Sequence, residues 1–471
     1  MQTTSTAEPV PRPAPAPHRW KALALLGTAQ LMLIVDVTVV AIALPHLGAD
    51  LDLTREATTW VVTAYTLAFG GLMLLGGRLA DLFGARRMVL VGLTVFTAAS
   101  LASGLAGSSE VLLGGRVAQG VGAALLSPAA LSAVLQLFDG DERTKALGIW
   151  SALGGGGAAL GVLLGGALTA GPGWPWVFYV NVPIGILVAV ALLRLLPRST
   201  ERGAGALDVP GALLVTAATG TAIYALIEAG DRGWTDGTTL LLLLGALALY
   251  GLFALRQRAA RSPLMDLRLL ARRPVAAGTF LIVTATALMV AGFFLGTFYL
   301  QHHAGHGAFA AGLMFLPVAV ATTIGATGGG HLIARLGGRG LAAAGFVVAA
   351  AGFAVPALLD GTTAVVAGIS SGALGLGAIF VAASATALGQ VAAHESGIAS
   401  GIVSTFHEFG ASLGAAAISS VAAASIGGAT TAGFVDGFTL ATVVAVVAGL
   451  ASLVLVPGRA PGAGHVHGGV H

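Results

Sequence analysis

Residues 77–87 read Gly-Arg-Leu-Ala-Asp-Leu-Phe-Gly-Ala-Arg-Arg, a short charged segment between two apolar runs at 57–77 and 88–107. Each run has about the 20 residues that a helix needs to cross the hydrocarbon core of a bilayer. Gly77 and Gly84 permit a tight turn, and the arginines suit a membrane surface. The segment therefore predicts two membrane-spanning helices joined by a short basic turn.

The composition of the whole chain excludes a protein dissolved in water. Only 9% of the 471 residues are charged, 56% are hydrophobic, and the mean hydropathy is +0.90. So few charges cannot cover a soluble surface, which excludes a soluble enzyme, a nucleic-acid-binding protein and a disordered protein. The net charge of +3 does not indicate a nucleic-acid partner. The lack of cysteine excludes disulfides and thiolate metal sites.

Apolar runs of this length recur along the chain, and we count fourteen. In the hydrocarbon core the backbone must satisfy its own hydrogen bonds, which favours helices. The predicted fold class is therefore an all-α membrane protein with fourteen transmembrane helices. The runs lie at 22–47, 57–77, 88–107, 110–136, 146–170, 176–196, 210–229, 238–255, 275–300, 309–333, 341–359, 363–391, 397–425 and 436–456.

The placement of basic residues predicts the orientation of the chain. If both termini are cytoplasmic, all but three of the 23 Lys and Arg residues fall on cytoplasmic loops or tails. The exceptions are Arg55 and Arg232, on the outer side, and Arg116, inside a span. Basic residues concentrate on the cytoplasmic side of membrane proteins. We therefore predict an even number of spans with cytoplasmic N- and C-termini.

The sequence contains an internal repeat. Segment 77–86 is similar to segment 330–339, which lies 253 residues later, and the same offset carries Gly157 to Gly410. Repeated six-helix halves are typical of transporters that rock around a central site. The predicted organisation is a six-helix bundle at 20–197, two inserted helices at 208–257 and a second bundle at 274–457, between disordered cytoplasmic tails at 1–19 and 458–471.

Segment 77–87 resembles the signature loop between helices 2 and 3 of the major facilitator superfamily. With fourteen spans, the chain is similar to the drug:proton antiporter branch of that superfamily. Further segments resemble motifs of this branch in helices 1, 4, 6 and 7: residues 36–45, 116–122, 176–185 and 207–211. Three positions depart from the branch pattern: Ala41 replaces Asn, Val162 replaces the Pro after Gly161, and His407-Glu408 replaces an Arg-Gln pair.

The resemblance implies a secondary active transporter, not an enzyme. It implies export of small amphipathic compounds (drugs, antibiotics or secondary metabolites) in exchange for protons, by alternating access. The energy source is then the proton gradient, with no cofactor or metal. The expected partners are the substrate, protons and the lipid bilayer, for a monomer in the cell membrane of a bacterium. The alternatives are a proton-coupled transporter of an ordinary metabolite, or a non-transporting membrane protein such as a receptor.

Ionisable side chains inside the membrane are costly and are therefore candidates for proton coupling. Asp36 is a candidate proton carrier, and Arg116, which keeps its proton, can hold a carboxylate ionised. Glu408 can bind either a proton or a cationic substrate. Its neighbour His407 titrates near neutral pH when unperturbed, although adjacent helical residues point about 100° apart. The structural alternatives are fixed ion pairs and polar contacts between helices.

Three further sets complete the candidate site. The loop 77–87 is a candidate conformational gate, with membrane-surface anchoring as the alternative; its residues are Gly77, Arg78, Asp81, Gly84, Arg86 and Arg87. Glycines spaced along one span resemble the antiporter motif and permit close helix crossing: Gly157, Gly161, Gly165 and Gly166. Candidate substrate-cavity residues, for which plain packing is the alternative, are Trp60, Tyr65, Gln119, Phe294 and Phe298.

Overall fold

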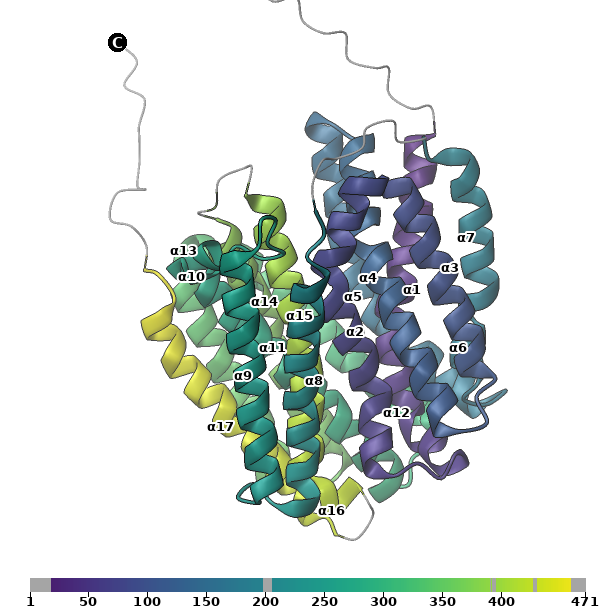
Figure 1. Cartoon of the computed structure of the whole chain (residues 1–471). Coiled ribbons are helices and arrows are strands. Elements are labelled where there is room, and N and C mark those ends of the chain that lie inside the picture. The colour runs from purple at the N-terminus through teal and green to yellow at the C-terminus, as the bar shows by residue number, and fades with distance from the viewer. Residues whose placement is uncertain (1–17, 198–205, 390, 392–394, 427–429, 459–471) are drawn as a thin grey trace, which may run out of the picture.

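The computed structural model describes residues 18–197, 206–389, 391, 395–426 and 430–458, and these are almost entirely helical (Figure 1). Nearly all of the two predicted tails lies outside the described residues, including Arg12 and Arg459. The segment 198–205, which contains Arg198 and Arg202, also lies outside them. The helices of the first half are α1 (Arg19–Asp50), α2 (Arg55–Phe83), α3 (Ala85–Gly104), α4 (Ser109–Leu137), α5 (Gly140–Ala170), α6 (Trp176–Tyr179), α7 (Asn181–Leu195), α8 (Val209–Arg232) and α9 (Gly237–Ala259).

The second half follows the same all-helical pattern. Its elements are α10 (Leu267–Ala271), α11 (Arg273–Phe298), the π-helical turn η1 (Tyr299–His303), α12 (Ala308–Met314), α13 (Leu316–Leu358), α14 (Thr362–Leu388), α15 (Ser396–Val421), α16 (Ala423–Ile426) and α17 (Ala432–Leu455).

The prediction of fourteen transmembrane helices is confirmed. Twelve helical stretches in the described part of the chain are long and apolar enough to cross a membrane. One of them, Ala308–Leu358, contains two crossings, because the chain turns at Gly337, whose φ is 70°. The remaining crossing is α15, whose 26 residues span about 39 Å at 1.5 Å per residue and pack along α11.

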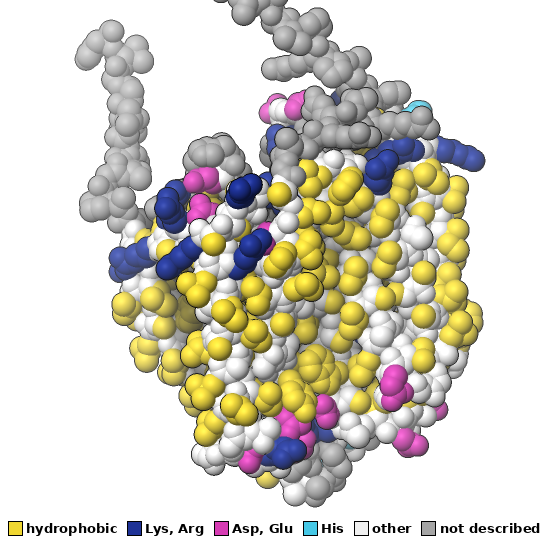
Figure 2. Space-filling view, viewed as in Figure 1, with side chains coloured by type: hydrophobic (Ala, Val, Ile, Leu, Met, Phe, Trp, Pro, Cys, Tyr) yellow, Lys and Arg dark blue, Asp and Glu magenta, His cyan; other side chains and the backbone are white. Residues whose placement is uncertain are grey.

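The two faces of the bundle differ in charge. Both described chain ends lie on one face, here called the terminal face, and the opposite face is called the distal face (Figure 1). Figure 2 shows most of the visible Lys and Arg side chains near the terminal face, above a belt of hydrophobic side chains. This distribution matches the positive-inside pattern if the terminal face is cytoplasmic.

The helices pack as two groups with a hairpin beside them. Within the N-group (α1–α7), α2 and α3 pack on α4, and α1 packs on α5. Within the C-group (α11–α17), α13 packs on α14 and α17, and α11 packs on α14 and α15. The hairpin α8–α9 lies against α2 and α15, which come from different groups. It therefore covers part of the seam between the two groups.

The internal repeat is visible in the backbone. Gly84 between α2 and α3 has φ 89°, and Gly337 has φ 70°. The two glycines are separated by the offset of 253 residues that relates the two repeated segments. Residues with a Cβ atom avoid this left-handed region. Glycine is therefore required at the same turn in both halves.

Close helix crossings also recur at this offset. A Cβ atom added at Gly157 of α5 would lie 2.7 Å from the Ile34 side chain of α1, and one added at Gly410 of α15, 253 residues later, would lie 2.5 Å from the Val283 carbonyl oxygen of α11. So α5 approaches α1 as α15 approaches α11. Small residues permit such contacts between membrane helices.

The substitution Gly414→Ala is expected to destabilise the protein by about 1–3 kcal/mol, the usual range for overpacking. The neighbouring atoms belong to the backbone of Ala287 and cannot rotate away. Gly397→Ala in the same helix is the control, because an added Cβ there meets nothing within 4 Å. Thermal unfolding of the purified protein in detergent measures both. Equal melting temperatures for the two variants would contradict a tight α11–α15 crossing.

The hairpin has its own polar anchor near the terminal face. The buried Asp208 carboxylate accepts hydrogen bonds from the Gly211 amide at 3.2 Å, Arg256 Nε at 2.9 Å and Gln257 Nε2 at 2.7 Å. Gln257 Oε1 in turn accepts from the Met265 amide at 3.0 Å. Asp208 therefore caps α8 and fastens it to α9 and to the segment that follows.

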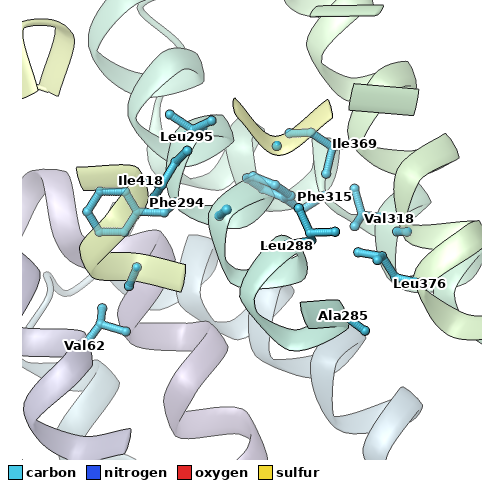
Figure 3. Close-up of a cluster of buried hydrophobic side chains, with 14 of the residues drawn as sticks. Val62, Ala285, Leu288, Phe294, Leu295, Phe315, Val318, Ile369, Leu376 and Ile418 are labelled. Carbon is cyan, nitrogen blue, oxygen red and sulfur yellow. The ribbon is translucent and has the colours of Figure 1, made fainter. Parts of the chain in front are cut away.

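The N-group and C-group are sealed together at the distal side. The largest apolar cluster joins distal residues of the N-group, such as Val39 and Val62, to Phe294 and Ile418 of the C-group (Figure 3). A separate cluster holds the terminal-side halves of α1 to α4 and contains only N-group residues among those described. The continuous core therefore bridges the two groups on the distal side.

Polar contacts follow the same division. On the distal side, Thr66 and Ser412 hydroxyls lie 2.6 Å apart, and Gln301 Nε2 donates to the Ile42 carbonyl at 2.9 Å. Near the terminal face, the described salt bridges Arg19–Glu142 and Arg272–Glu395 each stay within one group. The structure thus has a closed distal side, and no described salt bridge ties the groups together at the terminal face.

Candidate functional site

A buried charged network lies inside the N-group. The Asp36 carboxylate of α1 is 1% exposed and accepts hydrogen bonds from Arg116 Nη1 at 2.5 Å, Gln119 Nε2 at 3.0 Å and Asn181 Nδ2 at 3.3 Å. Arg116 and Gln119 lie on α4, and Asn181 begins α7. Three helices therefore converge on one carboxylate.

The Arg116 guanidinium is held from several other sides. Its Nε donates to the Val61 carbonyl of α2 at 2.8 Å, and its Nη1 also donates to Gln119 Oε1 at 2.9 Å. The guanidinium carbon lies 4.4 Å from the centre of the Tyr65 ring and 6.0 Å from that of Phe178. A cation over an aromatic face is stabilised by the ring quadrupole. Arg116 thus connects α1, α2 and α4 through one fixed charge.

The structure brings four of the predicted residues into this network: Asp36, Arg116, Gln119 and Tyr65. It also contains two residues that the sequence reasoning did not single out. For Asn181, the only indication in the sequence was that it lies in the segment 176–185, which resembles a family motif. Ser100 of α3 accepts a hydrogen bond from Gln119 Nε2 at 2.8 Å, and no sequence pattern pointed to it.

Glu408 lies at the interface between the two groups. It is half-buried, and a Cβ atom added at Gly70 of α2 would lie 2.7 Å from the Glu408 Cβ. Among the described residues, no salt bridge or side-chain hydrogen bond to its carboxyl group is found. A carboxyl group in this setting has no cation to compensate its ionised form, which favours binding a proton or a cationic ligand.

His407 faces a different environment from Glu408. Its Nδ1 lies 2.9 Å from the Thr286 hydroxyl of α11, and its ring centre lies 6.0 Å from that of Phe380 on α14. His407 therefore points into the C-group, whereas Glu408 points toward the N-group. Adjacent residues diverge in this way because they lie about 100° apart around a helix.

Tyr65 is fully buried beside the charged network. Its ring lies under the Arg116 guanidinium, and its hydroxyl donates to the Leu33 carbonyl of α1 at 3.4 Å. Tyr65 therefore helps to hold Arg116 in place between α1 and α2.

The candidate gate loop lies at the terminal face. Gly84 makes the turn, and Arg86 Nη2 donates to the Leu193 carbonyl of α7 at 2.6 Å. Asp81 is exposed and makes no salt bridge to a residue that the structure describes. Arg78 lies about one turn earlier in α2. Arg87 is exposed, and Gly77 approaches Pro128 of α4.

The candidate antiporter glycines serve two different contacts. Gly157, Gly161 and Gly165 lie against α1, where a Cβ atom added at Gly165 would lie 3.0 Å from Val39. A Cβ atom added at Gly166 would instead lie 2.8 Å from the Ala308 carbonyl oxygen, at the start of α12. Three glycines thus allow packing inside the N-group, and the fourth allows the distal contact with the C-group.

The candidate cavity aromatics are packed in this closed arrangement. Phe294 and Phe298 are each 2% exposed, and their ring centres lie 5.0 Å apart inside the cluster that bridges the two groups. Trp60 packs against a small cluster of α8 and α15 residues that includes Ile223 and Ile227. These aromatics therefore contribute to the distal seal.

The sequence is similar to proteins of antibiotic resistance and export. It is 39% identical over 440 residues to the puromycin resistance protein pur8 of Streptomyces alboniger, covering 89% of this chain and 86% of that protein. It is 37% identical to the cephamycin export protein CmcT of Amycolatopsis lactamdurans, covering 85% and 84% of the two chains. The lincomycin resistance protein of Streptomyces lincolnensis is 34% identical, with 93% and 91% covered.

The fold is shared with solved transporter structures. A bacterial homologue of the human lysosomal transporter Spinster superposes with a TM-score of 0.69 at 17% identity, covering 93% of this chain and 97% of that one. A peptide transporter POT bound to alafosfalin superposes with a TM-score of 0.64 at 18% identity, covering 93% and 96%. The sequence profile of the Major Facilitator Superfamily matches residues 26–415. The chain is thus a multi-pass membrane transporter, not an enzyme, and belongs to the Major Facilitator Superfamily.

Proposed function

We propose that this protein exports small amphipathic compounds, including antibiotics, in exchange for protons. The observation that carries the proposal is a pair of carboxyl groups in opposite settings inside a transporter fold. Asp36 is buried against Arg116, whereas Glu408 has no described cationic partner. The names of the relatives, which include puromycin and lincomycin resistance proteins and a cephamycin export protein, support antibiotic-like cargo.

Glu408 is the proposed site of exchange between proton and substrate. When neutral, its carboxyl group lies at the interface at little cost; when ionised, it attracts a cation. A proton and a cationic or amphipathic substrate then compete for the same group. Binding of one displaces the other, and this competition couples their movements in opposite directions.

The Asp36–Arg116 pair is proposed to couple protonation to helix position. Arg116 keeps its charge, so protonation of Asp36 would leave a buried cation without its counter-charge. The guanidinium must then find new acceptors, and α1, α2 and α4 must shift together because it contacts all three. A ligand changes a conformational equilibrium only through such differential contacts.

We place the terminal face in the cytoplasm, on the strength of its arginines. The conformation with a closed distal side is then the one that loads substrate from the cell interior. Asp81 and the arginines of the 77–87 loop would form their gate contacts when the terminal face closes. We further propose that the protein works as a monomer in the cell membrane.

Reconstitution tests the proposed function directly. In proteoliposomes with an imposed pH gradient, the protein is expected to move at least one of puromycin, lincomycin or a cephamycin against the proton flow. In a host without its own efflux pumps, expression is expected to raise resistance to the same compound. Liposomes without protein and liposomes without a gradient are the controls. If the pH gradient does not change the movement of any compound in a broad panel, proton-coupled export is refuted.

A further inference from the structure

Arg55 ties three helices together at the distal face. It begins α2, and its Nη1 donates to the Ser419 carbonyl at 3.3 Å and to the Ser419 hydroxyl at 3.1 Å, near the end of α15. Its Nη2 donates to the Ile227 carbonyl at 2.9 Å and to Asp231 at 2.6 Å, near the end of α8. One guanidinium thus joins the N-group, the C-group and the inserted hairpin.

Without these contacts, the position of Arg55 would be unfavourable for a positively charged side chain. It lies on the distal face, where the chain has few basic residues, and at a helix N-terminus, where the helix dipole disfavours a cation. Its side chain is only 11% exposed, whereas that of Asp231 is 58% exposed. The exposed ion pair contributes little, so the shielded bonds to Ser419 and Ile227 carry most of the interaction.

An apolar cluster supports the same three-way junction. Ile223 and Ile227 of α8 and Ala416 of α15 are fully buried together, with Trp60 of α2 packed beside them. A Cβ atom added at Gly230 of α8 would lie 2.9 Å from the Ser420 Cα of α15. The distal end of α8 is therefore packed tightly into the seam between α2 and α15, below the Arg55 contacts.

We propose that the inserted hairpin α8–α9 is a working part of the distal gate, with Arg55 as the residue that fastens it. Because α2 and α15 belong to different groups, opening the distal side must break the Arg55–Ser419 bonds. It must also release α8 from one of its two neighbours. This inference rests on the alternating access of the proposed function, and it assigns to the hairpin a role in holding the distal side closed.

The guanidinium is suited to this role by its shape. It presents five donors in a planar fork, and here it serves four acceptor atoms on two helices. A lysine ammonium carries the same charge as a single point with three donors, so it does not present this planar fork to acceptors on two helices. Arg55→Lys therefore keeps the charge but loses the clamp, which separates electrostatic attraction from geometric fastening.

A single reporter cysteine measures the state of the distal gate. The natural chain contains no cysteine, so an introduced cysteine is the only thiol available for labelling. Val62 is 4% exposed and packs in the cluster that bridges the groups, which also contains Ile418 and Phe294 (Figure 3). Val62→Cys in lipid nanodiscs is labelled by a polar maleimide only when the distal side opens.

Loss of the clamp is expected to raise the labelling rate of Val62→Cys. Adding Arg55→Ala should increase the rate about tenfold, as expected for the loss of a hydrogen-bonded charged group, and Arg55→Lys should give a similar increase. Arg232→Ala is the matched control, because Arg232 is exposed and its salt bridge among the described residues is to Glu228, one turn away in α8. If Val62→Cys with Arg55→Lys is labelled at the same rate as Val62→Cys alone, Arg55 does not fasten the gate. This result would be decisive even if Arg55→Ala fails to fold.

Cross-linking tests the hairpin itself. Two short reducible thiol cross-links are tested separately, one between Leu226→Cys of α8 and Leu413→Cys of α15 and one between Gly220→Cys of α8 and Leu67→Cys of α2. The link to the neighbour from which α8 separates is expected to keep Val62→Cys unlabelled until that link is reduced. The control link joins Thr221→Cys to Gly245→Cys within the hairpin, where a Cβ on Gly245 lies 4.0 Å from Thr221. If neither the link from α8 to α15 nor the link from α8 to α2 slows labelling, the hairpin is not part of the gate. These readouts need no substrate, so they stand or fall separately from antibiotic export.

Discussion

Replacing Arg116 with alanine is expected to abolish transport and to destabilise the protein by about 3–5 kcal/mol, the usual cost of removing one partner of a buried ion pair. The substitution leaves the Asp36 carboxylate in a buried site without its cation, and it removes the bond to the Val61 carbonyl. Thermal unfolding in detergent and gradient-driven efflux in proteoliposomes measure the two effects separately.

The double variant Asp36→Asn with Arg116→Gln separates a structural pair from a coupling pair. It removes both charges but keeps groups that can hydrogen-bond to Gln119 and Asn181. We expect it to recover most of the lost stability and none of the proton-coupled efflux. If it transports at the native rate, the pair is structural only. If Arg116→Ala unfolds at the native temperature, the pair does not stabilise the fold.

Glu408→Gln is expected to reduce gradient-driven efflux to the level of liposomes without protein. Glutamine keeps the shape of the side chain but cannot exchange a proton or attract a cation. Because no described salt bridge involves Glu408, the melting temperature should stay close to that of the native protein. A large loss of function with little loss of stability is the signature that distinguishes this variant from Arg116→Ala.

The matched control for Glu408 is its neighbour. His407→Gln should retain gradient-driven efflux, because His407 contacts Thr286 and faces into the C-group. Efflux is measured as substrate movement and as proton movement in the same vesicles. Full gradient-driven efflux by Glu408→Gln would show that another group carries the proton. Loss in both variants alike would indicate a general disturbance of α15.

Much of the fold could be predicted from the sequence, because a bilayer imposes length and polarity on every crossing. The turn at Gly337 could be predicted as well, since its segment repeats that of Gly84 at a fixed offset. The break between α12 and α13 could not be predicted, because it lies inside the apolar run 309–333. The π-helical form of the turn Tyr299–His303, at the end of the run 275–300, also left no pattern in the sequence. Hydropathy indicates whether a segment lies in the membrane or in water, and it carries little information on where the helix within that segment is interrupted.

The candidate site could be predicted only in part. The cost of a charge in the membrane identified Asp36, Arg116 and Glu408 one by one. Their geometry could not follow from this, since Asp36 and Arg116 are 80 residues apart and meet only through helix packing. Ser100 is a neutral side chain whose burial costs little, so nothing in the sequence distinguished it. Arg55 was visible only as an exception in the topology, and its partners on α8 and α15 became apparent in the folded chain.

The paired glycines at 84 and 337 have a consequence for the ancestry of this protein. Each half has the same turn at the same register, and each packs its fifth crossing on its first through glycine. The hairpin lies between the halves in the chain without altering the spacing inside either. A tandem duplication of a gene for a half-length protein, followed by the gain of two helices at the joint, would leave this arrangement. Those two helices would then lie at the seam between the halves, where α8 packs against α2 and α15.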